Sequence, residues 1–186
     1  MRVLGISGSL RRGSLNSALL RAAAERLPAG AELVEFDRLR DVPPYDEDLD
    51  AEAPAVVEDL RETVRSADAL LIATPEYNHS LPGQLKNALD WVSRPAGKSA
   101  LNGTPAAAIG ASTGMFGAVW AQAELRKVLG AMGSRVVEAE LPVGHAKEQM
   151  NGDRLELSPQ QSEQLEALLA ELVAAAERET ELAVAA

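Results

Sequence analysis

The chain has 186 residues, a length that fits one domain with a full hydrophobic core. Its formal net charge of −10 argues against nucleic acid and anionic membrane surfaces as partners, because phosphate-neutralising charge is missing. The chain has no cysteine, and so no disulfide or thiolate, which fits a cytoplasmic protein. No apolar run approaches the length of a membrane span. With only two histidines, far apart in sequence, a metal site is not expected.

In chain order, the first half alternates between strand and helix patterns. Apolar runs predict strands over residues 3–6, 31–36 and 67–74. The last of these runs is apolar on both faces, as in a buried parallel strand. Apolar residues at helical spacing predict a helix over residues 14–27 and another that begins at Pro54. Residues 37–53 are a polar, acidic connection, in which the run 46–48 is expected to be a solvated loop.

The second half continues the alternation. Residues 75–83 form a loop too elaborate for a simple turn between strand and helix. Further strands are predicted over residues 105–111 and 135–143. Further helices are predicted over residues 83–92, from residue 118 and from Ser158. The last of them opens with a capping-box pattern, in which Gln161 follows Ser158 by three residues, and its tail over residues 179–186 is expected to fray.

Five strands alternating with helices predict a single α/β domain over residues 1–186, with a doubly wound parallel sheet between two helix layers. In such sheets ligands bind at the carboxyl ends of the strands, near the point where the strand order reverses. In the order 2-1-3-4-5 the first, third and fourth strands lie side by side. Since the elaborate loops follow these three strands, we expect the loops to form one continuous site.

The first of these loops has the features of an anion site. Residues 5–17 read G-I-S-G-S-L-R-R-G-S-L-N-S, so a strand breaks into Gly, Ser and Arg and then opens a helix. The loop is not a Walker motif, because Ser14 stands where the lysine should be, and the dinucleotide G-x-G-x-x-G register is absent. Arg11 and Arg12 with several hydroxyls suit a terminal monophosphate. The alternative is an ordinary turn with a capped helix.

The other two loops suit a planar ring. Glu76, Tyr77, Asn78 and His79 combine flat and hydrogen-bonding groups, while Ser112–Thr113 lies beside another helix start, where donors could bond an electron-poor carbonyl. A phosphate, a polar chain and a planar heterocycle together indicate FMN. For Tyr77, as for Phe116, simple packing is the alternative.

Two motifs in this order resemble those of the NAD(P)H-dependent FMN reductases, a flavodoxin-like family that includes quinone, chromate and azo-dye reductases. They are the stretch over residues 5–16 and the block P-E-Y-N-H-S-L-P-G-Q-L-K-N-A-L-D-W over residues 75–91. The similarity runs from residue 2 to about residue 176. It implies a flavodoxin-like fold, noncovalent FMN, NAD(P)H as co-substrate, and a homodimer or homotetramer with the flavin near the subunit interface.

The resemblance also implies a set of cofactor-binding residues. The phosphate would be held by Ser9, Arg11, Ser14, Asn16 and Ser17, with Ser7 and Leu10 beside them. The isoalloxazine would be lined by Pro75, Glu76, Tyr77 and Asn78, and its pyrimidine end by Ser112, Thr113 and Gly114. Members of the family often carry arginine where this chain has His79.

The resulting hypothesis is a ping-pong oxidoreductase, in which NAD(P)H reduces the flavin and leaves before an acceptor takes the electrons. The acceptor would be a quinone, a second flavin, an azo compound or an oxidised metal ion such as chromate. His79 is a candidate proton donor, because its free pKa lies near neutrality; the alternative is a solvent-facing loop residue. No general base is identified.

Two other functions compete with this hypothesis. Residues 110–114 match the G-x-S-x-G pattern of a serine hydrolase, with Ser112 as nucleophile, His145 as base and Glu138 or Glu140 as acid. A flavodoxin-type electron carrier or redox binding module would fit the acidic composition, since acidic surfaces dock basic redox partners. The low aromatic content of 3% favours an exposed ring and therefore the reductase.

Overall fold

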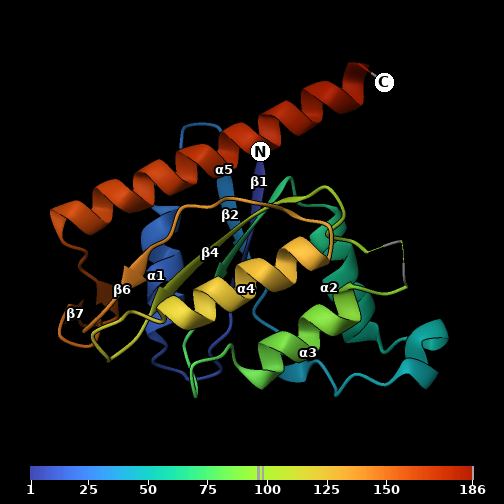
Figure 1. Cartoon of the computed structure of the whole chain (residues 1–186), viewed down its shortest axis with the longest axis horizontal. Coiled ribbons are helices and arrows are strands. Elements are labelled where there is room, and N and C mark those ends of the chain that lie inside the picture. The colour runs from blue at the N-terminus through green and yellow to red at the C-terminus, as the bar shows by residue number, and fades with distance from the viewer. Residues whose placement is uncertain (96, 98, 186) are drawn as a thin grey trace.

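The chain folds around a parallel sheet, described by a computed structural model over residues 1–95, 97 and 99–185, with side chains as far as residue 179 (Figure 1). The strand order β2-β1-β3-β4-β5 confirms the prediction, and β6 also pairs with β4. The strands are β1 (Arg2–Ser7), β2 (Glu32–Glu35), β3 (Ala69–Ala73), β4 (Pro105–Ala111), β5 (Arg135–Val136), β6 (Pro142–Val143), β7 (Met150–Asn151) and β8 (Arg154–Leu155). The helices are α1 (Leu15–Ala24), α2 (Ala55–Arg65), α3 (Gly83–Val92), α4 (Val119–Ala131) and α5 (Pro159–Ala185), with short 3-10 helices η1 (Leu39–Asp41) and η2 (Glu47–Glu52).

Alternation along the strands builds the three predicted layers. In β3, Ala69, Leu71 and Ala73 belong to a core shared with α1 and α5. Leu70 and Ile72 belong to the opposite core, shared with α2, α3 and α4. Burying one Leu or Ile side chain contributes about 1.5–3 kcal/mol, so a strand buried on both faces holds both helix layers to the sheet.

Helix α1 begins where the sequence predicts and ends earlier. Ser14 is its N-cap, and the Ser14 Oγ accepts a hydrogen bond from the Ser17 amide (3.1 Å). The helix ends at Ala24 instead of residue 27. Pro28 keeps Leu27 out of the helix, because the residue before a proline is disfavoured in the helical region.

Helix α5 (red in Figure 1) starts with the predicted capping box. The Gln161 amide donates to Ser158 Oγ (3.2 Å), and the Ser158 amide donates to Gln161 Oε1 (2.9 Å). The helix continues to Ala185, and the predicted fraying of residues 179–186 stays a prediction, since residue 186 lies outside the described residues. Among the described helices, including this one, none combines the length and apolarity needed to cross a membrane.

The fifth strand is not continuous, so the prediction of one strand over residues 135–143 is wrong. β5 ends at Val136, which pairs with Ala106, and β6 starts at Pro142, which pairs with Gly110. The segment between Val136 and Pro142 is two residues longer than the segment of β4 between Ala106 and Gly110. The two extra residues cannot pair with β4, so the segment bulges out of the sheet. An apolar pattern does not reveal this excess.

The acidic connection is anchored to α3. The run 46–48 is exposed, as predicted, but the connection also contains η1 and η2. Gln84 Nε2 donates to the carbonyls of Leu39 (2.8 Å) and Val42 (2.7 Å). Asn87 Nδ2 and Trp91 Nε1 both donate to the Pro43 carbonyl, at 2.8 and 2.9 Å. Polar residues of the 75–91 motif block therefore hold this connection in place.

Between β6 and α5 the chain forms a small hairpin that the sequence analysis did not predict. β7 and β8 are antiparallel and joined by a turn in which Gly152 has φ +64°. Its signal is the pair Gly152-Asp153, which forms the two-residue loop between the paired residues Asn151 and Arg154, because glycine at the first central position favours the turns of short hairpins.

The buried cation Arg61 links α2 to the acidic connection and to α3. The Arg61 side chain is 3% exposed, and its guanidinium contacts Asp50 (2.6 Å), Glu58 (2.7 Å) and the Trp91 carbonyl (3.1 Å). All three groups of the guanidinium fork are therefore satisfied by different elements. A buried ion pair of this kind costs most when only one partner is removed.

Replacing Arg61 with Met should therefore lower the free energy of unfolding by about 3 kcal/mol, because Asp50 loses its partner in a half-buried place. Denaturant unfolding followed by circular dichroism would measure it. The matched control is Arg65→Met. Because Arg65 pairs with Glu62 on the surface, this variant should change the free energy of unfolding by about 0.5 kcal/mol or less. Equal stability of the two variants would contradict the assigned role.

Candidate functional site

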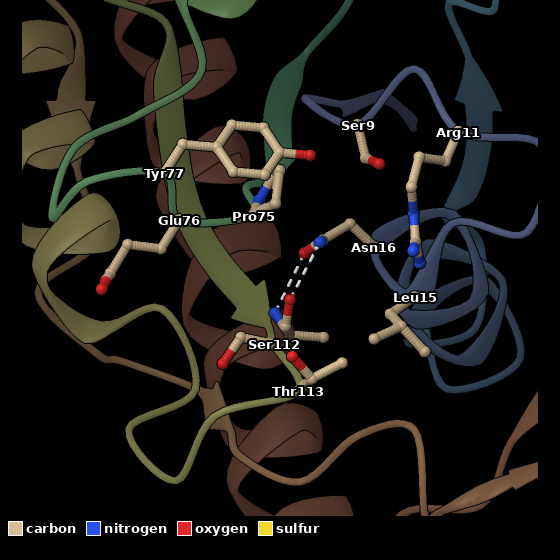
Figure 2. A pocket seen from close by; sticks show the side chains of 10 residues that line it. Ser9, Arg11, Leu15, Asn16, Pro75, Glu76, Tyr77, Ser112 and Thr113 are labelled. Atoms are coloured by element: carbon tan, nitrogen blue, oxygen red, sulfur yellow. Dashed lines mark hydrogen bonds between the residues drawn. The ribbon is translucent and has the colours of Figure 1, made fainter.

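A cavity lies where the loops after β1, β3 and β4 meet (Figure 2). The three strands are neighbours in the sheet, so their carboxyl ends bring the three loops to one edge, as expected. Eight predicted residues line this cavity: Ser9, Arg11, Asn16, Pro75, Glu76, Tyr77, Ser112 and Thr113. Leu15 and Ala111, which the sequence analysis did not single out, complete the lining. Ala111 could have been found from its place as the last residue of a central strand.

The loop after β1 is organised by its own hydroxyls. Ser17 Oγ donates to Ser7 Oγ (3.0 Å), which also accepts the Ser9 amide (3.4 Å). The Gly8 amide donates to the Ala73 carbonyl (2.8 Å), and a Cβ at Gly8 would meet Leu85 Cδ2 at 2.9 Å. The loop is thus pressed onto its neighbour, with hydroxyls and the α1 N-terminus gathered where an anion can bind.

Asn16 joins the first loop to β4. Its Nδ2 donates to the Ala111 carbonyl and its Oδ1 accepts the Ala111 amide, both at 3.0 Å, and the side chain is 2% exposed. Figure 2 shows these two bonds crossing the base of the cavity. The Asn16 side chain, which was predicted to hold phosphate, therefore bonds to the backbone of β4, and β4 lies two strands away from β1 in the sheet.

The loop after β3 presents Tyr77 from a tight turn. The Tyr77 and Ser80 backbones exchange two hydrogen bonds (3.0 and 3.1 Å), and the residues between them, Asn78 and His79, have φ values of 53° and 61°. Left-handed conformation at both central positions is the geometry of a type I′ turn. Tyr77 is 51% exposed and flanks the cavity with Pro75.

Glu76 helps to line the cavity, but its carboxylate points away from it. Its Oε2 accepts the amides of Trp120 (3.1 Å) and Ala121 (3.2 Å), so it satisfies the first turn of α4, whose own N-cap residue supplies no side-chain bond. The carboxylate also lies 3.6 Å from His79 Nδ1. Figure 2 shows it turned away from the Tyr77 ring. A negative charge at a helix N-terminus is stabilising, which explains a carboxylate here without a contact to any ligand.

Further cavities share lining residues with the first, and two of them contain most of the remaining predicted residues. Ser7, Leu10 and Ser17 line the second together with Ser9 and Arg11, so Ser9 and Arg11 stand between the two. Ser14 lines the third, which shares Arg11, Leu15 and Thr113 with the first. Asn78 and Gly114 are not among the lining residues of these three cavities.

The second cavity also contains acidic groups that the sequence analysis missed. Glu35 is the last residue of β2, Asp37 lies two residues beyond it, and both line this cavity together with Arg40. Burial raises the pKa of Glu35, the neighbouring Asp37 raises it further, and Arg21 opposes both. An anion bound beside this carboxylate must therefore lie close to a compensating cation.

The geometry does not support a serine hydrolase. Ser112 Oγ donates to the Gly114 carbonyl (3.2 Å), and His145 Nδ1 faces Glu148 at 3.7 Å. Neither Glu138 nor Glu140 contacts His145, and no side-chain bond joins His145 to Ser112 among the described residues. The hydroxyl and the imidazole that such chemistry needs are not brought together.

Comparison with known proteins agrees with this geometry. The family model described as NADPH-dependent FMN reductase matches residues 1–148. An NAD(P)H-dependent FMN reductase of Pseudomonas aeruginosa is 52% identical over 130 residues, and a quinone reductase of Escherichia coli is 41% identical over 131 residues; each match covers 69% of both chains. Among solved structures, the flavoenzyme NAD(P)H:(acceptor) oxidoreductase FerB from Paracoccus denitrificans gives a TM-score of 0.83 at 34% identity, covering 96% of this chain and 98% of that one. The chain therefore belongs to the NADPH-dependent FMN reductase family of oxidoreductases.

Proposed function

We propose that this protein binds FMN in the cavity at the ends of β1, β3 and β4 and uses it to pass electrons from NAD(P)H to small-molecule acceptors. The observation that carries the proposal is the joining of an anion-binding loop to a cavity flanked by an exposed aromatic ring. A molecule that carries a phosphate at one end and a planar ring at the other fits the residue types at the two ends of that cavity.

The donor set fits the phosphate end. Ser9 and Arg11 stand between the first and second cavities, and Ser17 lies at the start of α1. In the proposal these three side chains hold the phosphate, and Ser7 and Ser14 orient the loop through their bonds to Ser17. Charge-assisted bonds from Arg11 would supply most of the affinity for the dianion.

The ring end is formed by Pro75, Tyr77, Ser112 and Thr113. Bound FMN would supply the redox chemistry, namely acceptance of a hydride and its later release as electrons. The protein's part is to position the ring, with Pro75 and Tyr77 along one edge and Ser112 and Thr113 at another. Asn16 would fix the relative placement of the phosphate loop and β4, so that both ends fit one cofactor.

In the proposal, NAD(P)H and the acceptor bind one after the other at the same exposed side of the cavity, which is the order of a ping-pong reaction. Tyr77 is half exposed, so donor and acceptor can reach the same place in turn. We propose quinones as the principal acceptors, in line with the quinone reductase relative, and second flavins, azo compounds and chromate as further ones. Flat acceptors need only stacking and general polarity, which this face offers.

We also propose a homodimer or homotetramer. Met115, Phe116 and Trp120 are large apolar side chains that remain exposed next to the cavity, at 65%, 54% and 42%. Phe116 packs edge-on against Trp120 with ring centroids 5.0 Å apart, so the two form one patch. Exposed aromatic patches of this kind are typical of subunit interfaces.

The first test is the visible spectrum of the purified protein before and after anaerobic addition of NADPH. A yellow protein that releases FMN on heating and is bleached by NADPH is expected. A yellow protein that NADPH leaves unbleached would indicate a carrier. A colourless protein that takes up no added FMN would contradict the proposed cofactor site.

Arg11→Gln should weaken FMN binding about 10- to 100-fold, because a charge-assisted bond to the phosphate is lost. Titration of apoprotein, followed by flavin fluorescence, would measure this dissociation constant. Riboflavin is the matched control, since it has the same ring and no phosphate, and its affinity should not change. An equal loss for both flavins would show that Arg11 shapes the loop and does not bind phosphate.

His79→Gln should leave the pH dependence of quinone turnover unchanged. The His79 side chain is 75% exposed, and its ring packs edge-on against Trp120 with centroids 4.8 Å apart. It is not among the lining residues of the first cavity, so we expect no proton transfer through it. Steady-state rates between about pH 5.5 and 8, the range in which a free imidazole titrates, would detect the loss of a proton donor.

A further inference from the structure

A fourth cavity lies beside the candidate flavin cavity and takes no part in the function proposed above. It encloses about 420 Å³, which lies within the usual range for sites that bind small molecules. Its lining comes from the loops after β1 and β3, from η1 and from the start of α3. It shares Arg11 and Tyr77 with the first cavity, and Figure 2 shows the Tyr77 ring reaching toward the loop that carries Arg11. A molecule that lies against this ring can therefore extend from one cavity into the other.

The wall of the fourth cavity has an apolar part and a cationic part. Leu10, Tyr77 and Pro82 form the apolar part, in which Tyr77 is half exposed. Arg11 and Arg40 form the cationic part, and no carboxylate of the described residues lines this cavity. Both arginines also line the second cavity, but there two acidic residues oppose an anion. A flat apolar molecule with a negative charge at one end matches both parts of the fourth cavity.

Arg40 is held in place without a carboxylate partner. Its Nη2 donates to the Leu10 carbonyl, and Gln84 Nε2 anchors the same segment through the carbonyls of Leu39 (2.8 Å) and Val42 (2.7 Å). No carboxylate lies within 4.0 Å of its guanidinium, among the residues whose side chains are described. The bond to Leu10 uses one of the five N–H donors of a guanidinium, so the others stay available to an anion.

Of the two arginines, Arg40 is the one left for a second anion. Arg11 is proposed above to hold the FMN phosphate, and it also donates to the Gly13 carbonyl (3.2 Å). Arg40 does not line the first cavity. The first residues of α3, Gly83 and Gln84, line the fourth cavity with Arg40, and the partial positive charge of a helix start adds to that of the guanidinium. Arg40 is therefore placed to distinguish a charged ligand from an uncharged one.

We infer that the fourth cavity receives the charged end of the electron acceptor, and that Arg40 makes the enzyme prefer quinones with an ionised substituent, such as a sulfonate or a carboxylate. The inference rests on the function proposed above and names a class of acceptor within it. The quinone ring lies beside Tyr77, and its anionic group pairs with Arg40. An uncharged quinone gains the apolar contacts alone. The overall reaction is balanced as NAD(P)H, one proton and the quinone giving NAD(P)⁺ and the hydroquinone, so two electrons pass to the quinone ring.

Steady-state kinetics with a matched pair of acceptors test the inference, namely 1,4-naphthoquinone-2-sulfonate and 1,4-naphthoquinone. Arg40→Gln should lower kcat/KM for the sulfonate about tenfold, mainly by raising KM, and that for the parent quinone by less than about twofold. Because each quinone is compared with itself across the variants, the difference between their reduction potentials cancels. In the unchanged protein, kcat/KM for the sulfonate should fall as the salt concentration rises, while that for the parent quinone stays constant.

Arg38→Gln is the matched control. Arg38 lies in the same connection, pairs with Asp59 (2.9 Å) and does not line any of the four cavities. This variant should keep the kinetics of both quinones. Arg40→Lys retains the positive charge, so it should recover part of the rate with the sulfonate.

Binding of a redox-inert analogue gives a readout that does not depend on turnover. Isothermal titration should show naphthalene-2-sulfonate binding the FMN-loaded protein about tenfold more weakly after Arg40→Gln. The dissociation constant of FMN, followed by flavin fluorescence, should stay within about twofold of that of the unchanged protein.

An equal loss of kcat/KM for the two quinones, or no loss for either, would overturn the inference. So would a change in KM for NADPH in place of that for the sulfonate, which would assign the cavity to the donor. A weaker FMN affinity of Arg40→Gln would also overturn it, by assigning Arg40 to the cofactor loop. The proposed function is judged separately, by whether the unchanged protein contains FMN and reduces the uncharged quinone with NADPH.

Discussion

The candidate site depends on the two hydrogen bonds between Asn16 and Ala111. One amide side chain, buried at the start of α1, satisfies both backbone groups of the last residue of β4. Those groups lie where the sheet ends and would otherwise lack partners in a dry environment, at a cost of about 1–3 kcal/mol each. Because the bond pair has a fixed geometry, the phosphate loop and the loop after β4 cannot move independently.

The loop after β3 is held from behind in the same way. Glu76 bonds to the first amides of α4, so the turn carrying Tyr77 is attached to that helix. Gln122, fully buried in α4, bonds to the Gly117 carbonyl (3.0 Å) and accepts the Leu141 amide (3.3 Å). The loops around the cavity thus share a single framework of side-chain to backbone bonds. Such preorganisation lets a site hold a cofactor without reorganising when it binds.

Much of the 75–91 motif block serves architecture. Gln84, Asn87 and Trp91 all donate to carbonyls of the acidic connection, and the Trp91 carbonyl accepts Arg61. In this chain, these polar side chains at a fixed helical spacing hold one particular loop against one particular helix. The residues in direct reach of a ligand, Pro75 and Tyr77, are a small part of the block.

The layers, the strand order and the edge where the site lies were predictable from sequence, because alternating apolar patterns and the rules of parallel sheets determine them. The break between β5 and β6 was not, since it depends on counting residues against β4, which only pairing reveals. Of the eight predicted residues that line the first cavity, five came from loop composition, namely Arg11, Glu76, Tyr77, Ser112 and Thr113. Ser9, Asn16 and Pro75 came only from the resemblance to the family. The hydrogen bonds of the Asn16 and Glu76 side chains were not predicted. Both side chains bond to backbone groups far away in sequence, and every residue has such groups, so the residue pattern does not indicate which of them is the partner.

Charge distribution decides where phosphates can lie on this acidic protein. Glu35 and Asp37 border one side of the phosphate loop, and the third cavity, lined by Arg12, Arg21 and Lys147, borders the other. Burial already raises the pKa of Glu35, so a dianion on that side would add to an existing electrostatic cost unless Arg11 stood between them. Arg11 lines all three of these cavities, so it lies between the acidic side and the cationic side of the loop. A dianion near this loop is therefore stabilised by Arg11 and by the cations Arg12 and Lys147 beyond it, and it is opposed on the side that carries Glu35 and Asp37.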